Sequence, residues 1–300
     1  MKNGSVCAGI VLYHPDEERL AQNIAAIQGQ VERIILIDNG TSVREKLGQA
    51  YADTQSFVWI ENSENLGIAK ALNQIVAQAK TLGFDWVLTL DQDSVVCADM
   101  VVIQAEILEN NPNAAIIVPS IVDRNLMTLE EYQKQELPDC ESINICITSG
   151  ALTNVQSVED VGGFCEKLFI DFVDIELCLR LRKKGYDIVQ ANKTYLLHEV
   201  GRMQKVYVFP RFGELTGIEW FKRPKTVSNH SPMRVYYQSR NLIYMLRKYG
   251  TFFVPHPFRY WISFCRGIAL RLLVEKEKVR KLLAFWKGVF AGIFMDIRGI

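Results

Sequence analysis

Short, almost wholly apolar runs that alternate with helical segments constrain the fold of this chain more than any other feature. The clearest runs are residues 6–13 (VCAGIVLY), 33–37 (RIILI) and 86–90 (WVLTL). A run that is apolar at successive positions predicts a strand buried on both faces. Residues 17–28 and 67–80, which lie between these runs, have apolar residues at helical spacing. Strands that alternate with helices in this way predict an α/β fold with a mainly parallel sheet flanked by helices.

The same reading predicts the remaining elements. Further strands are expected at residues 56–61, 114–119, 143–148, 187–191 and 194–197, and further helices at 43–52, 99–110 and 170–184. Residues 123–142 are polar and are expected to form an irregular loop. Strand patterns vanish beyond residue 205, where residues 232–250 and 258–296 are expected to form a helical extension.

Charge divides the chain into two parts. Residues 205–300 hold 18 Lys+Arg and 5 Asp+Glu, a net charge of +13, whereas residues 1–204 hold 16 and 29, a net charge of −13. We therefore expect one domain at 1–204 and a basic, mainly helical extension at 205–300. A basic part suits an anionic surface; packing on the first domain or on a second subunit is the alternative. No nucleic-acid-binding motif accompanies the basic residues.

The cysteines, the N-terminus and the apolar residues near the C-terminus indicate where in the cell the protein is expected. The seven cysteines are an odd number without CxxC or Cys/His ligand spacing, so we expect reduced thiols in a cytoplasmic protein. The N-terminus lacks the apolar stretch of a signal peptide. The best candidate for a membrane span, residues 251–274, contains three arginines and two prolines, so a spanning helix is not expected.

Two carboxylates follow the strand predicted at 86–90. Asp91 and Asp93 stand on alternate residues at the carboxyl end of that strand, where open α/β sheets bind ligands. Alternate residues can face one ion, and Mg²⁺ or Mn²⁺ prefers such oxygen ligands and also binds phosphate oxygens. The alternative is a pair of solvated acids in a loop. The position at a strand end favours a metal site.

Polar residues also follow the strand at 33–37 and open the helix at 67–80. Asp38 could accept hydrogen bonds from a nucleobase or ribose, or could simply belong to an Asn-Gly turn. Asn65 and Gly67 could contact the same nucleotide. The structural alternative makes Asn65 the N-cap of the helix.

Acidic residues cluster where the helix at 170–184 is expected to begin. Asp171 and Asp174 are three residues apart and so share one helical face, whereas Glu176 points elsewhere. One of them could be a general base, although acids in a first helical turn also favour the helix dipole. His198, after the last strand pattern, is either structural or a ligand.

A polar and aromatic cluster opens the helix expected at 232–250. Its members are Arg234, Tyr236, Tyr237, Arg240 and Asn241. An arginine such as Arg240 matches phosphate oxygens with its planar fork, so the cluster could grip a diphosphate. It could equally pack on the first domain.

Taken in order, the motifs IDNG, ENLGIAKALN, LTLDQDS, TSGAL, GGF, DFVDIELCLRLRKKGY and HEVG resemble those of the family-2 glycosyltransferases of the GT-A (Rossmann-like) fold. Within that family the chain looks most like bacterial rhamnosyltransferases of O-antigen and other surface polysaccharides. The resemblance runs from about residue 6 to residue 201, and more loosely over residues 234–241. It implies an inverting, metal-dependent hexosyltransferase that uses a nucleotide sugar, best matched by dTDP-L-rhamnose.

The resemblance also implies roles for single residues. Asp38 would contact the base, with Asn65 and Gly67 in the same pocket. Asp91 would contact the sugar or ribose, and Asp93 would bind Mg²⁺ or Mn²⁺.

The catalytic base follows from the pattern acid-x-x-Leu-x-x-Arg, which is met here by Asp174, Leu177 and Arg180. Relatives often have Glu-Asp where this chain has Val173-Asp174, so Asp171 stays a second candidate. His198 matches a position that helps to hold the metal or the diphosphate.

The acceptor implied by the resemblance is a saccharide or lipid-linked saccharide at the cytoplasmic face of the membrane, which suits the basic extension. A homo-oligomer is a further possibility. A nucleotidyltransferase is disfavoured because Tyr13-His14-Pro15 stands where its glycine-rich loop would be. The non-enzymatic alternative is a nucleotide-sugar-binding subunit of a polysaccharide assembly complex.

Overall fold

The computed structural model describes residues 5–51, 55–123, 128–198, 204–206, 214–217, 225–227 and 229–299. The chain falls into two compact units, residues 1–199 and residues 200–299, which we call the first and second units. Each is described by itself.

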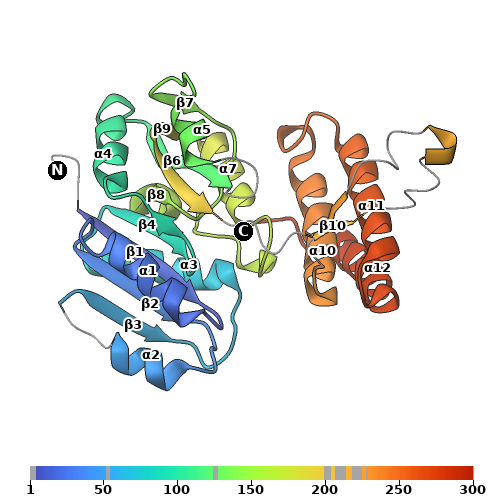
Figure 1. Ribbon diagram of the computed structural model, residues 1–300, viewed down its shortest axis with the longest axis horizontal. Coiled ribbons are helices and arrows are strands. Elements are labelled where there is room, and N and C mark those ends of the chain that lie inside the picture. Colours follow the sequence, from blue (N-terminus) through green and yellow to red (C-terminus); the bar gives the residue numbers. More distant parts are fainter. Residues whose placement is uncertain are drawn as a thin grey trace. The chain divides into compact units, whose positions relative to one another are not determined.

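A nine-stranded mixed sheet forms the first unit (Figure 1). The strand order is β3-β2-β1-β4-β8-β6-β9-β5, with β7 paired to β9. The strands β3, β2, β1 and β4 run parallel, as do β6 and β9, whereas β8 is antiparallel to both of its neighbours. Their bounds are β1 (Val6–Leu12), β2 (Arg33–Asp38), β3 (Phe57–Glu61), β4 (Trp86–Asp91), β5 (Val95–Val96), β6 (Ala114–Asp123), β7 (Cys140–Ser142), β8 (Ala151–Asn154) and β9 (Asp187–His198).

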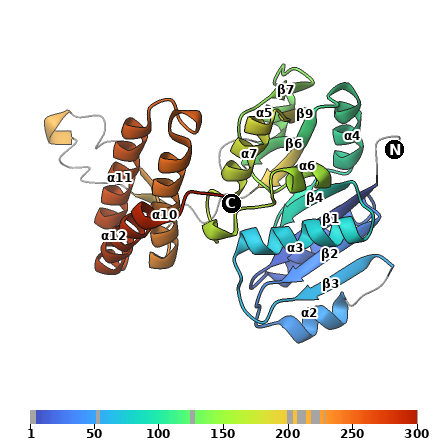
Figure 2. The ribbon, with the colours of Figure 1, turned by 180° about the vertical axis from the view of Figure 1, so that it is seen from behind.

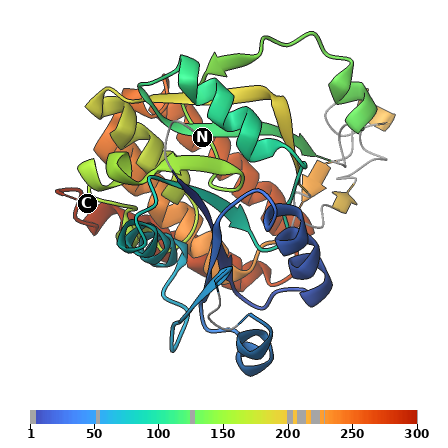
Figure 3. The same ribbon diagram turned by 90° about the vertical axis from the view of Figure 1, so that its left-hand side faces the viewer.

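Helices cover both faces of this sheet. Helix α1 lies on one face and α3 on the other (Figure 2, Figure 3). Because successive side chains of a strand point to opposite faces, the central strands need apolar residues at every position, and Ile10, Leu36 and Leu88 are fully buried. The helices are α1 (Glu17–Ile27), α2 (Arg44–Ala50), α3 (Ile68–Thr81), α4 (Met100–Asn110), α5 (Leu129–Gln133), α6 (Val155–Asp160) and α7 (Val173–Lys184).

Three stretches differ from the sequence-based expectation. Residues 143–148, predicted as a strand, are irregular, and the strand at that place is β8. The loop expected at 123–142 contains α5 and β7. The two short strands expected at 187–197 are one strand, β9, which is interrupted by a register shift against β6.

The second unit is mainly helical. Its three long helices are α10 (Pro232–Tyr249), α11 (Pro257–Val274) and α12 (Lys278–Phe294), and Val235, Ile268, Phe285 and Val289 form their buried core. The short antiparallel pair β10 (Gln204–Val206) and β11 (Lys225–Val227) was not expected, because three-residue strands leave too little pattern to read. Within the part of the chain that the structure describes, no helix is both long and apolar enough to cross a membrane.

Candidate active site

The end of β4 and the turn after it hold the predicted pair of carboxylates at the edge of the sheet. The main-chain N–H of Asp91 donates to Ser149 Oγ (3.0 Å), and its carbonyl accepts from Asn23 Nδ2 (2.6 Å). The side-chain amide of Gln92 exchanges two hydrogen bonds with the main chain of Tyr13, at 2.8 and 3.2 Å. Gln92 therefore points toward β1 and ties the ends of two parallel strands together. The Asp93 side chain is left exposed at this edge.

The sheet register brings His198 to the same edge. Strand β5 pairs antiparallel with β9, with Val95 opposite Leu197. Continuing this register by one residue sets His198 opposite Ser94, which directly follows Asp93. The structure describes the backbone of His198 but not its side chain, so its predicted role as a ligand lies outside the described part.

The donor set at this edge suits a hard divalent cation. Asp91 and Asp93 supply carboxylate oxygens, and Mg²⁺ is commonly bound by one or two carboxylates together with substrate phosphates. Among the described residues, no group of three or more His, Cys, Asp or Glu side chains gathers closely enough to hold a metal alone. The chemistry therefore fits a cation whose remaining ligands include the oxygens of a substrate diphosphate; the predicted contribution of His198 stays a prediction.

The loop before α7 is strained and carries the second candidate for the base. Helix α7 begins at Val173, three residues later than expected, because Asp171 and Phe172 have φ values of +62° and +67°. Asp171 is thus outside the helix, and the expectation that it shares a helical face with Asp174 is wrong. Phe169 also has a positive φ, of +43°. Left-handed residues other than glycine cost free energy and gather at functional sites.

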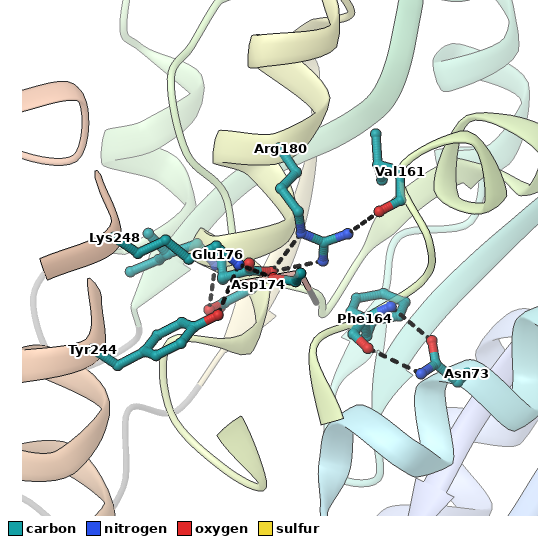
Figure 4. Close-up of polar contacts among 10 residues, drawn as sticks. Asn73, Val161, Phe164, Asp174, Glu176, Arg180, Tyr244 and Lys248 are labelled. Atoms are coloured by element: carbon teal, nitrogen blue, oxygen red, sulfur yellow. Dashed lines mark hydrogen bonds and ion pairs between the residues drawn. The ribbon is translucent and has the colours of Figure 1, made fainter. Parts of the chain in front are cut away.

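This strained loop is clasped to the beginning of α3. The carbonyl of Phe169 accepts from the N–H of Ile68 (2.7 Å). Gly67 has a φ of +85°, and a Cβ there would stand 2.6 Å from the Phe169 ring, so this position requires glycine. Asn73 donates to the carbonyl of Phe164 (3.0 Å) and accepts from its N–H (2.7 Å), as Figure 4 shows. Gly67 therefore positions the loop that leads to Asp174, a role that the sequence reading missed.

The carboxyl of Asp174 has a raised pKa. Loss of solvation raises its pKa to about 6, and the negative charges of Asp91 and Asp171 act in the same direction. A hydrogen bond of 2.8 Å from the N–H of Ile175 to Asp174 Oδ1 opposes that rise. Asp91, Asp171 and Asp174 are thus close enough to interact. A carboxyl with a pKa near neutrality suits a general base.

Glu176, the third acid of this stretch, has a structural position. Its side chain is fully buried, and its Oε2 accepts from Arg180 Nε (2.8 Å) and Nη2 (2.6 Å). Arg180 also donates to the carbonyl of Val161 (2.5 Å), as Figure 4 shows. Because the side chain of Arg180 is itself only 10% exposed, the pair as a whole is shielded from solvent, and Glu176 is removed from the candidates for the base.

An apolar cavity of about 260 Å³ lies beside Asp174. Its wall includes Ile121, Ile145 and Ile147, each more than a third exposed. Cys146 also lines it, and its thiol lies 3.5 Å from that of Cys178. The hydrogen bond with Cys178, followed by burial, raises the pKa of Cys146. Sequence reasoning missed this wall because the alternation of isoleucine with polar residues in 143–148 is typical of a strand.

The predicted nucleotide residues lie at the end of β2. Asp38 is fully buried; it accepts from the N–H of Thr41 (2.8 Å) and forms an ion pair with Arg44. Arg44 Nη2 donates to the carbonyl of Asn62 (2.5 Å). The sequence analysis did not predict a role for Arg44. The signal that could have indicated one is a positive charge six residues after Asp38. An open hollow of about 730 Å³ is lined by residues 40–46 and Ser63.

Asn65 is not the N-cap of α3. The cap residue is Gly67, whose N–H donates to Asn65 Oδ1 (2.9 Å). Asn39 Nδ2 donates to the same oxygen (3.1 Å), which links the loops after β2 and β3. Asn65 thereby joins the two turns that border the hollow, and its predicted contact with a nucleotide stays a prediction.

Arg240 belongs to α10 of the second unit. Its Nε donates to Asn241 Oδ1 (2.9 Å), and its guanidinium lies 4.6 Å from the centre of the Tyr237 ring. These contacts hold the polar and aromatic cluster together within the second unit. The predicted contact of Arg240 with a donor phosphate stays a prediction.

Comparison with known proteins identifies the family. The model of "Glycosyl transferase family 2" matches residues 8–164, more than half of the chain. The chain belongs to glycosyl transferase family 2. It is 27% identical over 260 residues to the dTDP-rhamnosyl transferase RfbF of Shigella flexneri, which covers 82% of this chain and 81% of that protein. The family predicted from the motifs is confirmed.

Solved glycosyltransferase structures share the fold of this family member. GalNAc-T7 with UDP, GalNAc and Mn²⁺ matches with a TM-score of 0.59 at 12% identity, over 84% of this chain and 50% of that one. The chain thus spans about half the length of GalNAc-T7. The mannosyltransferase PcManGT from Pyrobaculum calidifontis, in complex with GDP-Man and Mn²⁺, matches with a TM-score of 0.55 at 13% identity. The match covers 97% of this chain and 87% of that one. The predicted GT-A fold is confirmed.

Proposed function

We propose that this protein is an inverting, metal-dependent hexosyltransferase that moves L-rhamnose from dTDP-L-rhamnose to a saccharide or lipid-linked saccharide. The observation that carries the proposal is the electrostatic interaction of Asp174 with Asp91, the last residue of β4, and with Asp171, together with the pKa of Asp174, which is raised to about 6. The similarity to a dTDP-rhamnosyl transferase supports the choice of donor. We place the reaction in the cytoplasm, in the synthesis of a surface polysaccharide such as O-antigen.

In this proposal Asp174 takes the proton of an acceptor hydroxyl. The acceptor oxygen forms a bond to the anomeric carbon on the face opposite the nucleotide, and the bond from that carbon to the diphosphate oxygen breaks. A single displacement of this kind inverts the anomeric configuration. General-base assistance contributes about 10²–10⁴-fold to the rate. Orientation of the two substrates supplies a further large part.

The donor would lie along the carboxyl ends of β2 and β4. Asp38, with its partner Arg44, would border the nucleotide together with Asn65 and Gly67. Asp91 would face the sugar or ribose. Arg240 would bind phosphate from the second unit, and residues 1–204 would form the catalytic domain.

Asp93 and His198 would hold Mg²⁺ or Mn²⁺ at the diphosphate. When bound, such a cation neutralises the charge that develops on the leaving diphosphate. The support is the exposed Asp93 carboxylate at the strand end and the register that brings the backbone of His198 beside it.

The test is thermal stabilisation of the full chain by dTDP, UDP and GDP and by their sugars, each with and without Mn²⁺ or Mg²⁺. A ligand at about 100 times its Kd adds roughly 2.7 kcal/mol to the free energy of unfolding. We expect dTDP and dTDP-L-rhamnose to stabilise most, and only with the metal. The Asp93→Asn variant should lose the metal-dependent part of this stabilisation. The matched control, Asp99→Asn, changes an exposed acid of the next turn and should keep it.

The same panel decides against the proposal if the result differs. Stabilisation by UDP alone would support the same class of enzyme with a UDP-sugar as the donor. Binding of dTDP-L-rhamnose without release of dTDP, tested with candidate acceptors, would indicate a non-catalytic subunit. The absence of any nucleotide effect would overturn the assignment.

A further inference from the structure

The outward side of α12 is an unbroken apolar surface. Seven large apolar side chains of this helix are exposed, among them Trp286 at 50%, Phe290 at 57% and Phe294 at 83%. At about 100° per residue, all seven fall within roughly a third of the helix circumference. We call this surface the α12 outer face; its residues are Val279, Leu282, Leu283, Trp286, Phe290, Ile293 and Phe294.

The opposite side of α12 already provides the core of the second unit. Phe285 and Val289 are buried there against Val235 and Ile268. Gly288 and Gly292 lie so close to α10 that an added Cβ would stand 2.4 and 2.5 Å from its carbonyl oxygens. The outer face therefore takes no part in the core of its own unit. An exposed apolar surface of this extent marks an interaction site.

Charge indicates what covers this surface. Neither α11 nor α12 contains an acidic residue. Lys278 and Lys287 are exposed on the two margins of the outer face, and residues 205–300 as a whole carry a net charge of +13. A second copy would bring this positive surface against itself, whereas an anionic surface complements it.

We propose that α12 lies in the headgroup region of an anionic lipid bilayer, with its outer face among the acyl chains. An apolar face bordered by lysines, with a tryptophan within it, is the pattern of a helix that lies in an interface without crossing it. Arg280 lies on the side of Lys287, but its charge is paired with the carboxylate of Glu277 (2.8 Å), so the two lysines are the cations on which the inference depends. This inference goes beyond the sugar-transfer reaction and does not depend on the identity of the donor.

The test uses the full chain and vesicles of phosphatidylcholine, with or without an equal part of phosphatidylglycerol, separated by flotation. We expect binding to the anionic vesicles that weakens with salt. Trp286→Ser with Phe290→Ser should weaken it about tenfold or more, because two inserted aromatic side chains are lost. Lys278→Gln and Lys287→Gln should each weaken it about fivefold.

The matched control is Val102→Ser with Leu137→Ser, which removes two exposed apolar side chains of the first unit. It should bind vesicles as the wild type does. All the changed residues are exposed, and the Tm of each variant checks that the fold is kept.

Two results would overturn the proposal. One is a failure of the wild type to bind anionic vesicles. The other is a dimer in light scattering that dissociates in the Trp286→Ser, Phe290→Ser variant and persists with vesicles present, because a second copy would then cover the outer face. Stabilisation by dTDP, measured on the same samples, separates either result from a failure of the proposed reaction.

Discussion

The protonation of one side chain, Asp174, should govern the pH dependence of the reaction. A general base must be ionised before it can accept a proton, and burial together with Asp91 and Asp171 raises the pKa of Asp174 to about 6. We therefore expect kcat/KM to rise as the pH increases through about 6 and then to level off. Release of dTDP, measured from about pH 5 to about pH 8, checks this. Asp174→Asn should lower kcat by about 10²–10⁴-fold.

The companion variant Asp171→Asn distinguishes the two candidates for the base. It removes a negative charge that raises the pKa of Asp174, so the rise in kcat/KM should move to lower pH while activity is kept. Asp174→Asn should also raise the Tm near neutral pH. In the wild type, the pKa of Asp174 in the folded state is above its unfolded value. The free energy of unfolding therefore falls as the pH rises from about 4 through about 6, and the uncharged Asn side chain avoids this loss. If Asp171→Asn were the inactive variant and Asp174→Asn the active one, the two roles would be exchanged.

Helix α7 carries the proposed base, Asp174, in its first turn, and the buried ion pair between Glu176 and Arg180 joins that turn to the next. Arg180→Met would leave the fully buried carboxylate of Glu176 without its cation, which costs about 3–5 kcal/mol of unfolding free energy. Urea unfolding measures this loss. Lys193→Met, which breaks the exposed ion pair with Asp139, is the control and should cost less than about 1 kcal/mol. Equal losses in the two variants would contradict a structural role for the buried pair.

The sequence predicts those elements whose pattern has a single physical cause. Strands β1, β2 and β4 were predicted because a strand buried on both faces must be apolar throughout, and the carboxylates of Asp91 and Asp93 could be placed at their edge for the same reason. The beginning of α7 was missed, because Asp171 and Phe172 adopt a left-handed backbone that their residue types do not announce. The pairing of Asp38 with Arg44 was missed because it depends on how the loop folds back.

The whole molecule joins two units that have separate cores and opposite net charges. Gly288→Ala should test their independence, because its new Cβ would stand 2.4 Å from the carbonyl oxygen of Tyr236 on α10. Such overpacking costs about 1–3 kcal/mol. We expect faster hydrogen exchange in the second unit alone, and weaker binding to anionic vesicles.

Gly267→Ala is the matched control, since nothing lies within 4 Å of the added Cβ and alanine favours a helix by about 1 kcal/mol over glycine. It should leave exchange in the second unit unchanged or slower. Stabilisation by dTDP should survive both changes if the first unit binds the donor by itself. Loss of that stabilisation in Gly288→Ala alone would instead show that the donor site needs the second unit, as the predicted contact between Arg240 and a phosphate requires.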